Sequence, residues 1–314
     1  MDNLTHTLAG AVLARAGLGR RTPLAMPTLL LAANLPDLDV LAYLRDPLFA
    51  LTFRRGWSHG VLAMAVLPLA LAGGMAAWDR LVRRRRRPDG APAPFRELLL
   101  LSFAGVLSHP LLDLLNTYGV RLLMPFSGRW FYGDTLFIVD PWLWGLLGLA
   151  WALPVVESRR DGARPSGNGR ARSARIIGGL AVLYIGMMFG LGRFAAAASA
   201  RGVAALGLDP DRLMASPVPL HPLRRSVLVD LGDSYRWGSY AWGQSGFMLA
   251  AGSIPKNLER PEIAPLLERP EARAFLGWSR FPAAVWAPAG VRLYDLRYAG
   301  GETDSWASVV ITPR

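Results

Sequence analysis

The first 200 residues alternate long apolar runs with short polar segments. An apolar run of about 18 residues or more with few charges can cross a bilayer as a helix. The pattern predicts four such membrane-spanning helices, at 60–78, 98–115, 136–156 and 176–200.

Two shorter apolar segments, 5–18 and 24–33, precede these runs. A helix of about fourteen residues rises only ~21 Å, which is too short to cross a bilayer comfortably. We expect a helical hairpin that is either embedded in one side of the membrane or made of two closely packed spans. The pattern does not choose between these arrangements.

After Arg201 the chain changes to short stretches in which apolar and polar residues alternate, which is typical of half-buried strands. Strands are predicted at 226–231, 235–242, 291–298 and 306–312, and one or two short helices at 260–276. This part of the chain is therefore expected to form a small α+β domain.

The predicted fold is mainly α, with a multi-pass transmembrane helical bundle followed by a small extracytoplasmic α+β domain. Residues 157–175 are rich in Gly, Ser, Pro and Arg and lack apolar periodicity, which predicts a flexible linker. The predicted parts are a helical membrane-embedded domain at 1–156, the cytoplasmic linker at 157–175, a transmembrane helix at 176–200 and the α+β domain at 201–314.

The net charge of +12 indicates how the helices are oriented. Most of it lies in residues 1–200, concentrated at 80–87 and 159–175, beside apolar runs. Arginines in this position face the cytoplasm, so we expect both clusters to be cytoplasmic and expect no nucleic-acid partner. Asp2 and His6 occupy positions where a signal peptide is basic or apolar, which predicts retained anchors rather than a cleaved leader.

Six side chains that can bind a metal fall toward the outer side in this topology: His6, Asp37, Asp39, His59, His109 and Asp113. His59 precedes the span that ends at the arginine cluster, so it lies at the opposite, outer end of that span. His109 and Asp113 are four residues apart and share one helix face. Charged groups among apolar residues need a partner, and a divalent metal is the simplest one.

The chain has no cysteine, so a metal must be held by His, Asp, Glu or backbone oxygen. Three imidazoles with three carboxylates favour zinc first, then manganese or iron, over calcium, which prefers oxygen ligands. The ligand number allows one or two ions, and such a site hydrolyses phosphoesters or amides by lowering the pKa of bound water. Asp37, His59 and Asp113 are the predicted catalytic residues.

Each of these residues also has a structural interpretation. His6 could cap a helix or lie at the membrane interface. Asp37 and Asp39 could cap turns. His109 and Asp113 could form a buried hydrogen-bonded pair. Asp134 and Asp140 could be further ligands, hydrogen-bond partners of the ligands or helix caps. Asn34 and Asn116 are expected to be hydrogen-bond partners of the ligands or turn residues rather than ligands.

The ordered series of motifs resembles the LexA-binding, inner-membrane-bound metal-dependent hydrolases, a YdjM-like family. The resemblance is carried by MDNLTH at 1–6, ANLPDLD at 33–39, RGWSH at 55–59, and SHPLLD at 108–113 with NTYG at 116–119. It implies a multi-pass protein of the bacterial inner (cytoplasmic) membrane with metal-dependent hydrolase activity. LexA binding is implied by the family name alone. A more distant likeness to helical zinc phospholipase C and P1 nuclease favours phosphodiester or phospholipid-like substrates.

The prediction is a membrane-bound metal-dependent hydrolase acting on a phosphoester or another lipid-borne bond, with the metal site and the C-terminal domain on the extracytoplasmic side. Besides the lipid bilayer, a lipid-borne substrate is the expected partner. The alternative is a non-catalytic, metal-stabilised membrane protein that binds an envelope component or a partner protein. An ion transporter would need polar residues in the cytoplasmic halves of the spans, and 60–78 and 98–106 have almost none.

Overall fold

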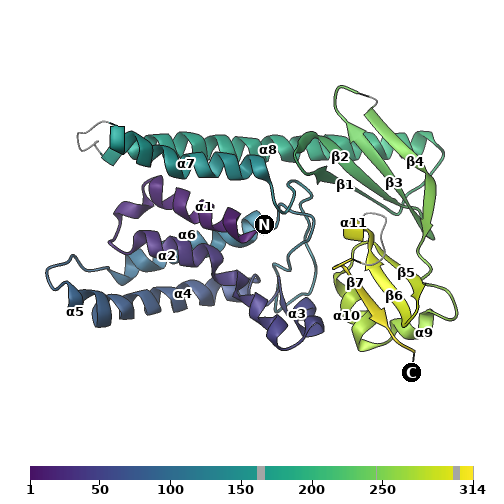
Figure 1. The fold of residues 1–314 in the computed structure, drawn as a ribbon, viewed down its shortest axis with the longest axis horizontal. Coiled ribbons are helices and arrows are strands. Elements are labelled where there is room, and N and C mark those ends of the chain that lie inside the picture. The colour runs from purple at the N-terminus through teal and green to yellow at the C-terminus, as the bar shows by residue number, and fades with distance from the viewer. Residues whose placement is uncertain (161–166, 245, 300–304, 314) are drawn as a thin grey trace. The chain divides into compact units, whose positions relative to one another are not determined.

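A computed structural model describes residues 1–160, 167–244, 246–299 and 305–313 (Figure 1). The chain divides into two compact units. The helical unit comprises Met1–Val40 and Arg54–Phe189, and the sheet unit comprises Leu41–Phe53 and Gly190–Arg314. The division differs from the predicted one, because the sheet unit begins within the last long helix and includes a short segment from the N-terminal part.

The described chain is mostly helical, as predicted. The helical unit contains α1 (Asn3–Arg15), α2 (Ala25–Asn34), α4 (Val61–Trp78), α6 (Phe95–Asp113), α7 (Pro141–Arg160) and the first part of α8 (Gly167–Ala205). Two 3₁₀ segments, η1 (Leu18–Arg20) and η2 (Leu35–Leu44), flank α2. Asp2 caps α1 by accepting the backbone N–H of Thr5 at 3.1 Å.

Three predicted boundaries are wrong for local reasons. The segment predicted at 24–33 continues as helix to Asn34 and then as η2, where Pro36 has no N–H to continue α-helical hydrogen bonding. The helix predicted to end at Trp78 continues through a π-helical turn (η3, Asp79–Arg83) and α5 (Arg84–Arg86), because buried Asp79 accepts the N–H of Ala93 at 3.0 Å and pairs with Arg83. The predicted linker 157–175 is helical at both ends, since α7 reaches Arg160 and α8 begins at Gly167.

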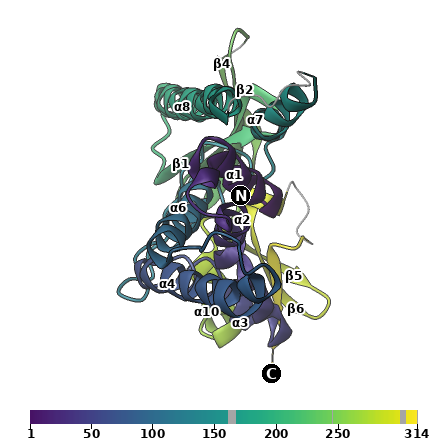
Figure 2. The same cartoon turned by 90° about the vertical axis from the view of Figure 1, so that its left-hand side faces the viewer.

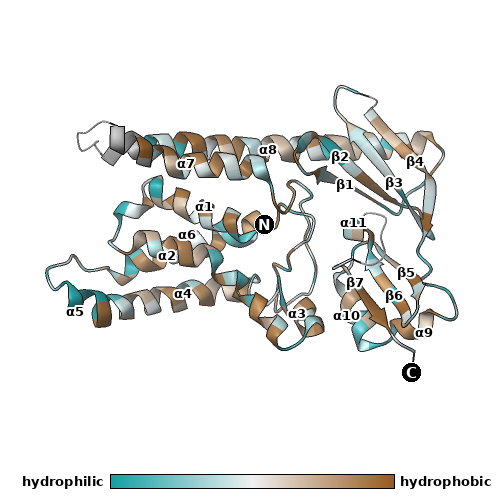
Figure 3. Ribbon diagram, viewed as in Figure 1, coloured by the Kyte–Doolittle hydropathy of each residue, from teal (hydrophilic) through white to brown (hydrophobic). Residues whose placement is uncertain are grey.

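Four helical segments of the described residues are long and apolar enough to cross a membrane: Ala25–Leu44, Val61–Arg86, Phe95–Asp113 and Ala171–Ala205. Brown apolar residues run along these helices in Figure 3. The predicted span at 136–156 corresponds to α7 and is not among the four, whereas α2 with η2 is.

Helix α2 packs against both α1 and α6, and α4 packs against α6 (Figure 2). Gly10 of α1 and Gly105 of α6 lie where these helices meet α2. A Cβ at Gly10 would lie 2.8 Å from the carbonyl oxygen of Leu29, and one at Gly105 would lie 2.4 Å from the Cβ of Ala32. Small residues permit this close approach of membrane helices. The contact sets how close η2, which follows α2, comes to α6.

The sheet unit holds two antiparallel sheets. One has the order β1 (Arg212–Val218), β2 (His221–Asp230), β3 (Ser234–Ala241) and β4 (Gly246–Pro255). The other has the order β5 (Pro282–Ala287), β6 (Gly290–Asp295) and β7 (Ser308–Ile311). Four short helices belong to the same unit: α3 (Pro47–Phe53), α9 (Ala264–Leu267), α10 (Pro270–Trp278) and α11 (Leu296–Ala299).

The sheets share a core in which the rings of Tyr235 and Phe281 meet edge to face at 5.8 Å. Strands β1, β4 and β5 are absent from the prediction. Pro217 interrupts the pattern of β1, and glycine and alanine in β4 hide the alternation on which strand prediction depends. The strand predicted at 291–298 ends at Asp295 because α11 begins there.

Asp295 is the buried polar centre of the sheet unit. It accepts hydrogen bonds from Ser279 Oγ at 2.6 Å and from the Arg297 guanidinium at 2.9 and 3.0 Å. Burial alone would raise the pKa of Asp295, but Arg297 holds it below its ordinary value. The stabilisation from this carboxylate is therefore complete at neutral pH and declines as the pH falls below about 4.

Asp295→Asn is expected to lower the free energy of unfolding by about 3–5 kcal/mol at pH 7, because Arg297 becomes an uncompensated buried charge. Thermal unfolding of the full chain in detergent, followed by circular dichroism, measures the effect. Glu268→Gln is the control, since the Glu268–Arg273 pair is exposed and such pairs contribute little. Equal unfolding midpoints for both variants would contradict the assignment.

Gly105→Ala is expected to destabilise the helical unit by about 1–3 kcal/mol, because the added methyl group overlaps Ala32 of α2. The matched control is Gly73→Ala in α4, where no atom lies within 4 Å of the added Cβ. The same thermal unfolding measurement compares them. A Gly105→Ala variant as stable as Gly73→Ala would show that α2 and α6 are not in close contact.

Candidate metal centre

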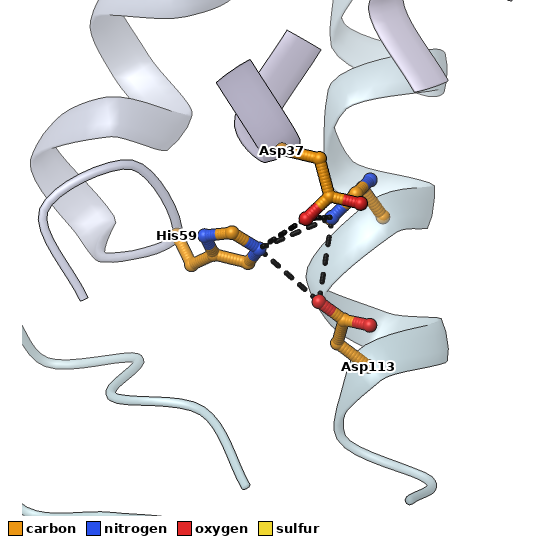
Figure 4. A group of neighbouring side chains, drawn as sticks. Asp37, His59 and Asp113 are labelled. Atoms are coloured by element: carbon orange, nitrogen blue, oxygen red, sulfur yellow. Dashed lines mark hydrogen bonds and ion pairs between the residues drawn. The ribbon is translucent and has the colours of Figure 1, made fainter. Parts of the chain in front are cut away.

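The candidate site is built from three elements of the helical unit (Figure 4). Asp37 lies on η2, His59 directly precedes α4, and His109 and Asp113 lie one turn apart on α6. His59, His109 and Asp113 are 0% exposed, and Asp37 is 7% exposed. We call these residues the four-residue group, and one ligand atom of each lies within 4.8 Å of all the others.

The distances within the group match those around a single metal ion. His59 Nε2 lies 3.1 Å from His109 Nε2, 3.1 Å from Asp113 Oδ2 and 3.9 Å from Asp37 Oδ1. His109 Nε2 lies 3.3 Å from Asp113 Oδ2 and 3.5 Å from Asp37 Oδ1. Four ligands bound at 2.0–2.1 Å to a tetrahedral metal lie about 3.3 Å from one another.

Hydrogen bonds at the far side of each imidazole determine which nitrogen carries the proton. His109 Nδ1 lies 2.6 Å from the carbonyl oxygen of Ala33, which can only accept, so Nδ1 donates. Ser58 Oγ donates to Asp39 at 2.7 Å and lies 2.8 Å from His59 Nδ1, so it accepts from that nitrogen. In the neutral rings both Nε2 atoms therefore carry lone pairs.

With both rings neutral, the group brings together two imidazole lone pairs and two carboxylate oxygens. Asp37 Oδ1 is buried and accepts no hydrogen bond from the described residues, whereas Asp113 Oδ2 forms an ion pair with Arg55. Burying an acceptor such as Asp37 Oδ1 without a hydrogen bond costs several kcal/mol. A divalent cation removes this cost, and the donor set fits one.

Two positive groups already lie against Asp113. The Arg55 guanidinium contacts Oδ2, and the ammonium group of Met1 contacts Oδ1. Both residues are buried, at 7% and 2% exposure. Asp113 is therefore the carboxylate around which all the charges of the site are arranged.

His6 and Asp39 lie beside the four-residue group and are not members of it. The His6 ring stacks on that of His109 with centroids 3.6 Å apart, and its Nε2 lies 3.3 Å from Asp113 Oδ1. Burial lowers the pKa of His6 to about 4, so the ring is neutral at pH 7. Neither ring nitrogen of His6 has a hydrogen bond within the described chain.

Asp39 orients His59 through Nδ1, the ring nitrogen that faces away from the four-residue group. Its Oδ2 lies 3.4 Å from His59 Nδ1 and accepts the backbone N–H of Arg55 at 2.9 Å, while Oδ1 accepts from Arg54 Nε at 3.0 Å. A 3₁₀ helix turns about 120° per residue, which explains why Asp37 and Asp39 point in different directions. A carboxylate behind a metal-binding histidine fixes its tautomer and its orientation.

The four remaining candidates make structural contacts. Asn34 bonds with Thr7 and with the carbonyl oxygen of Leu30. Asn116 Oδ1 accepts the N–H groups of Tyr118 and Gly119, as in a turn. Asp140 caps α7 through the N–H of Leu143 and accepts from Tyr184. Asp134 has a left-handed backbone, with φ of 48°.

Two functional residues were not predicted. Ser58 links Asp39 to His59, and Arg55 contacts Asp113. The signal available for both is their position in the RGWSH motif, because a serine beside the histidine and a buried arginine need polar partners.

Asp39→Ala is expected to weaken metal binding about 10- to 100-fold without abolishing it, because His59 loses the partner that orients it. Zinc affinity of the purified protein, measured by competition with a chromogenic chelator, tests this. Asp89→Ala, at an exposed position, is the control. Complete loss of metal would instead make Asp39 a ligand, and an unchanged affinity would contradict its role.

A known protein family matches the part of the chain that contains the candidate site. The family described as YdjM inner membrane protein matches residues 1–195, which contain every residue of the four-residue group. No curated protein and no solved structure matches the chain. Since the match covers more than half of the sequence, the chain belongs to the YdjM inner membrane protein family.

Proposed function

We propose that this protein is a membrane-bound metal-dependent hydrolase that cleaves a phosphoester in a lipid-borne substrate. The observation that carries the proposal is the four-residue group, in which two imidazole nitrogens and two carboxylate oxygens converge within 4.8 Å of one another. Asp37, His59 and Asp113, the predicted catalytic residues, act in this proposal by holding the metal together with His109.

Two imidazoles with two carboxylates favour zinc, with manganese or iron as alternatives. The bound metal supplies Lewis-acid activation of water and neutralises negative charge on the substrate. In the reaction a water oxygen bonds to phosphorus, the bond from phosphorus to the leaving oxygen breaks, and the leaving alcohol takes up a proton.

His6 supports a second metal position. Its Nε2 lies 3.3 Å from Asp113 Oδ1, whereas Asp113 Oδ2 faces His59 and His109. One carboxylate thus has imidazoles at both of its oxygens, as does a carboxylate that bridges two ions. Oδ1 also contacts the ammonium group of Met1, so a second ion would replace that contact. The buried ring nitrogens of His6 have no hydrogen bond within the described chain, so His6 is free to serve as a ligand.

Membrane location supports a lipid-borne substrate. The family is named for the inner membrane, and four apolar helices are long enough to cross it. An apolar groove of about 450 Å³ in the helical unit is lined by α1, α6, α7 and α8, and includes Val12, Leu112, Leu147 and Ile185. Leu112 precedes Asp113 on α6, so the helix that carries the site also forms one wall of the groove.

Charge distribution supports an extracytoplasmic site. His59 precedes α4, whereas the arginines at 80–87 follow it. By the positive-inside rule the arginine end is cytoplasmic, so we propose that the metal centre and the C-terminal domain face the opposite side.

The burial of the group favours a second candidate function. Four protein ligands complete a tetrahedral site, and closed sites are typical of structural metals. In that case the protein would be a metal-stabilised membrane protein that binds an envelope component or a partner protein.

An activity assay separates the two functions. Zinc- or manganese-loaded protein is expected to hydrolyse bis(p-nitrophenyl) phosphate or a short-chain phospholipid, and His59→Ala is expected to lose at least about 100-fold of that rate, since the metal is lost with its ligand. His221→Ala, at an exposed position that begins β2, is the control. A wild-type protein with stoichiometric metal and no hydrolysis of either substrate would contradict the hydrolase and favour the structural role.

A further inference from the structure

Arg55 is placed where it can bind a substrate, and this inference rests on the proposed function. Its guanidinium contacts Asp113 Oδ2, the same oxygen that lies 3.1 Å from His59 Nε2 and 3.3 Å from His109 Nε2. The positive charge therefore lies directly beside the position of the metal. A ligand bound to the metal would lie within reach of the guanidinium.

The backbone of Arg55 is held in an unfavourable conformation. Its φ is 54°, in the left-handed region that residues other than glycine rarely adopt. The N–H donates to Asp39 Oδ2 at 2.9 Å, and the carbonyl oxygen accepts the N–H of Arg121 at 2.8 Å. Strain that the surroundings enforce in this way is characteristic of functional positions. Here it directs the guanidinium toward Asp113.

The guanidinium keeps hydrogen-bond donors for a ligand. It has five N–H groups. Within the described chain, one nitrogen contacts Asp113, the other terminal nitrogen lies 3.4 Å from the carbonyl oxygen of Met1, and the group lies 5.4 Å from the ring centroid of Tyr118. These contacts do not use all of the donors.

The charges of the site favour an anionic ligand. A divalent metal would balance Asp37 and Asp113, and Arg54 pairs with Asp39 at 3.0 Å. Arg55 and the ammonium group of Met1, which both contact Asp113, then give the buried site an excess of positive charge, and burying such a charge is costly. An anion from the substrate removes that cost.

We propose that Arg55 binds a phosphate oxygen of the substrate next to the metal, which makes the substrate class a phosphate ester and not an amide. A metal held by the four-residue group would share Asp113 Oδ2 with the guanidinium, so a ligand of both would have to offer them different oxygens. A tetrahedral phosphate does so, and the planar fork of arginine matches two of its oxygens. The phosphate belongs either to a lipid head group or to a soluble phosphoester.

Binding of inorganic phosphate by the metal-loaded full chain in detergent tests the proposal. Calorimetry gives the dissociation constant, and mass spectrometry of the same samples gives the metal content. Arg55→Lys keeps the charge beside Asp113, so it should fold and keep its metal, but it loses the planar fork. We expect its phosphate dissociation constant to rise about tenfold or more. Arg129→Gln, at an exposed position between α6 and α7, is expected to bind as the wild type does.

The outcomes separate this inference from the proposed function. A wild type that takes up no metal overturns the proposed function, and the inference falls with it. A metal-loaded wild type that binds no phosphate, or an Arg55→Lys variant that keeps both metal and affinity, overturns only the inference. Displacement of phosphate by short-chain phosphatidic acid supports a lipid head group as the source, and displacement by glycerol phosphate alone supports a soluble phosphoester.

Discussion

Repulsion among two imidazole nitrogens and two carboxylates, of which only Asp113 contacts positive groups, is the constraint on which the site of the helical unit depends. His59 and His109 direct their Nε2 atoms at each other across 3.1 Å, and the carboxylates of Asp37 and Asp113 close the group. Water does little to offset this repulsion, because the four residues are buried. A cation is the partner that converts this repulsion into attraction, and it would then bind three separate elements together.

The helix packing serves this convergence. Gly10 and Gly105 let α1 and α6 approach α2 closely, so that η2 delivers Asp37 to the ring of His109. The carbonyl oxygen of Ala33, freed near the end of α2, fixes the tautomer of His109. Asp39 does the same for His59 with the help of Ser58. Backbone geometry and the polar partners behind the ligands therefore determine the site together.

The sequence predicts the helices and the convergence of the site residues on one side. The lengths of apolar runs, the positions of arginine clusters and the spacing of residues along a helix can all be identified within short stretches of sequence. It does not separate the four-residue group from Asp39 and His6, because the 3₁₀ geometry that turns Asp37 and Asp39 apart has no distinct pattern. The RGWSH motif likewise does not predict that Arg55 has a left-handed backbone. Strands β1, β4 and β5 depend on pairing partners far along the chain, and their residues alternate poorly.

The most direct test of a metal held by the four-residue group is X-ray absorption at the zinc edge of the loaded protein. The account predicts about four nitrogen and oxygen ligands near 2.0–2.1 Å, with the scattering of two imidazoles that falls to one in His109→Ala. A protein that binds no zinc, or whose zinc spectrum is the same in wild type and His109→Ala, would contradict it.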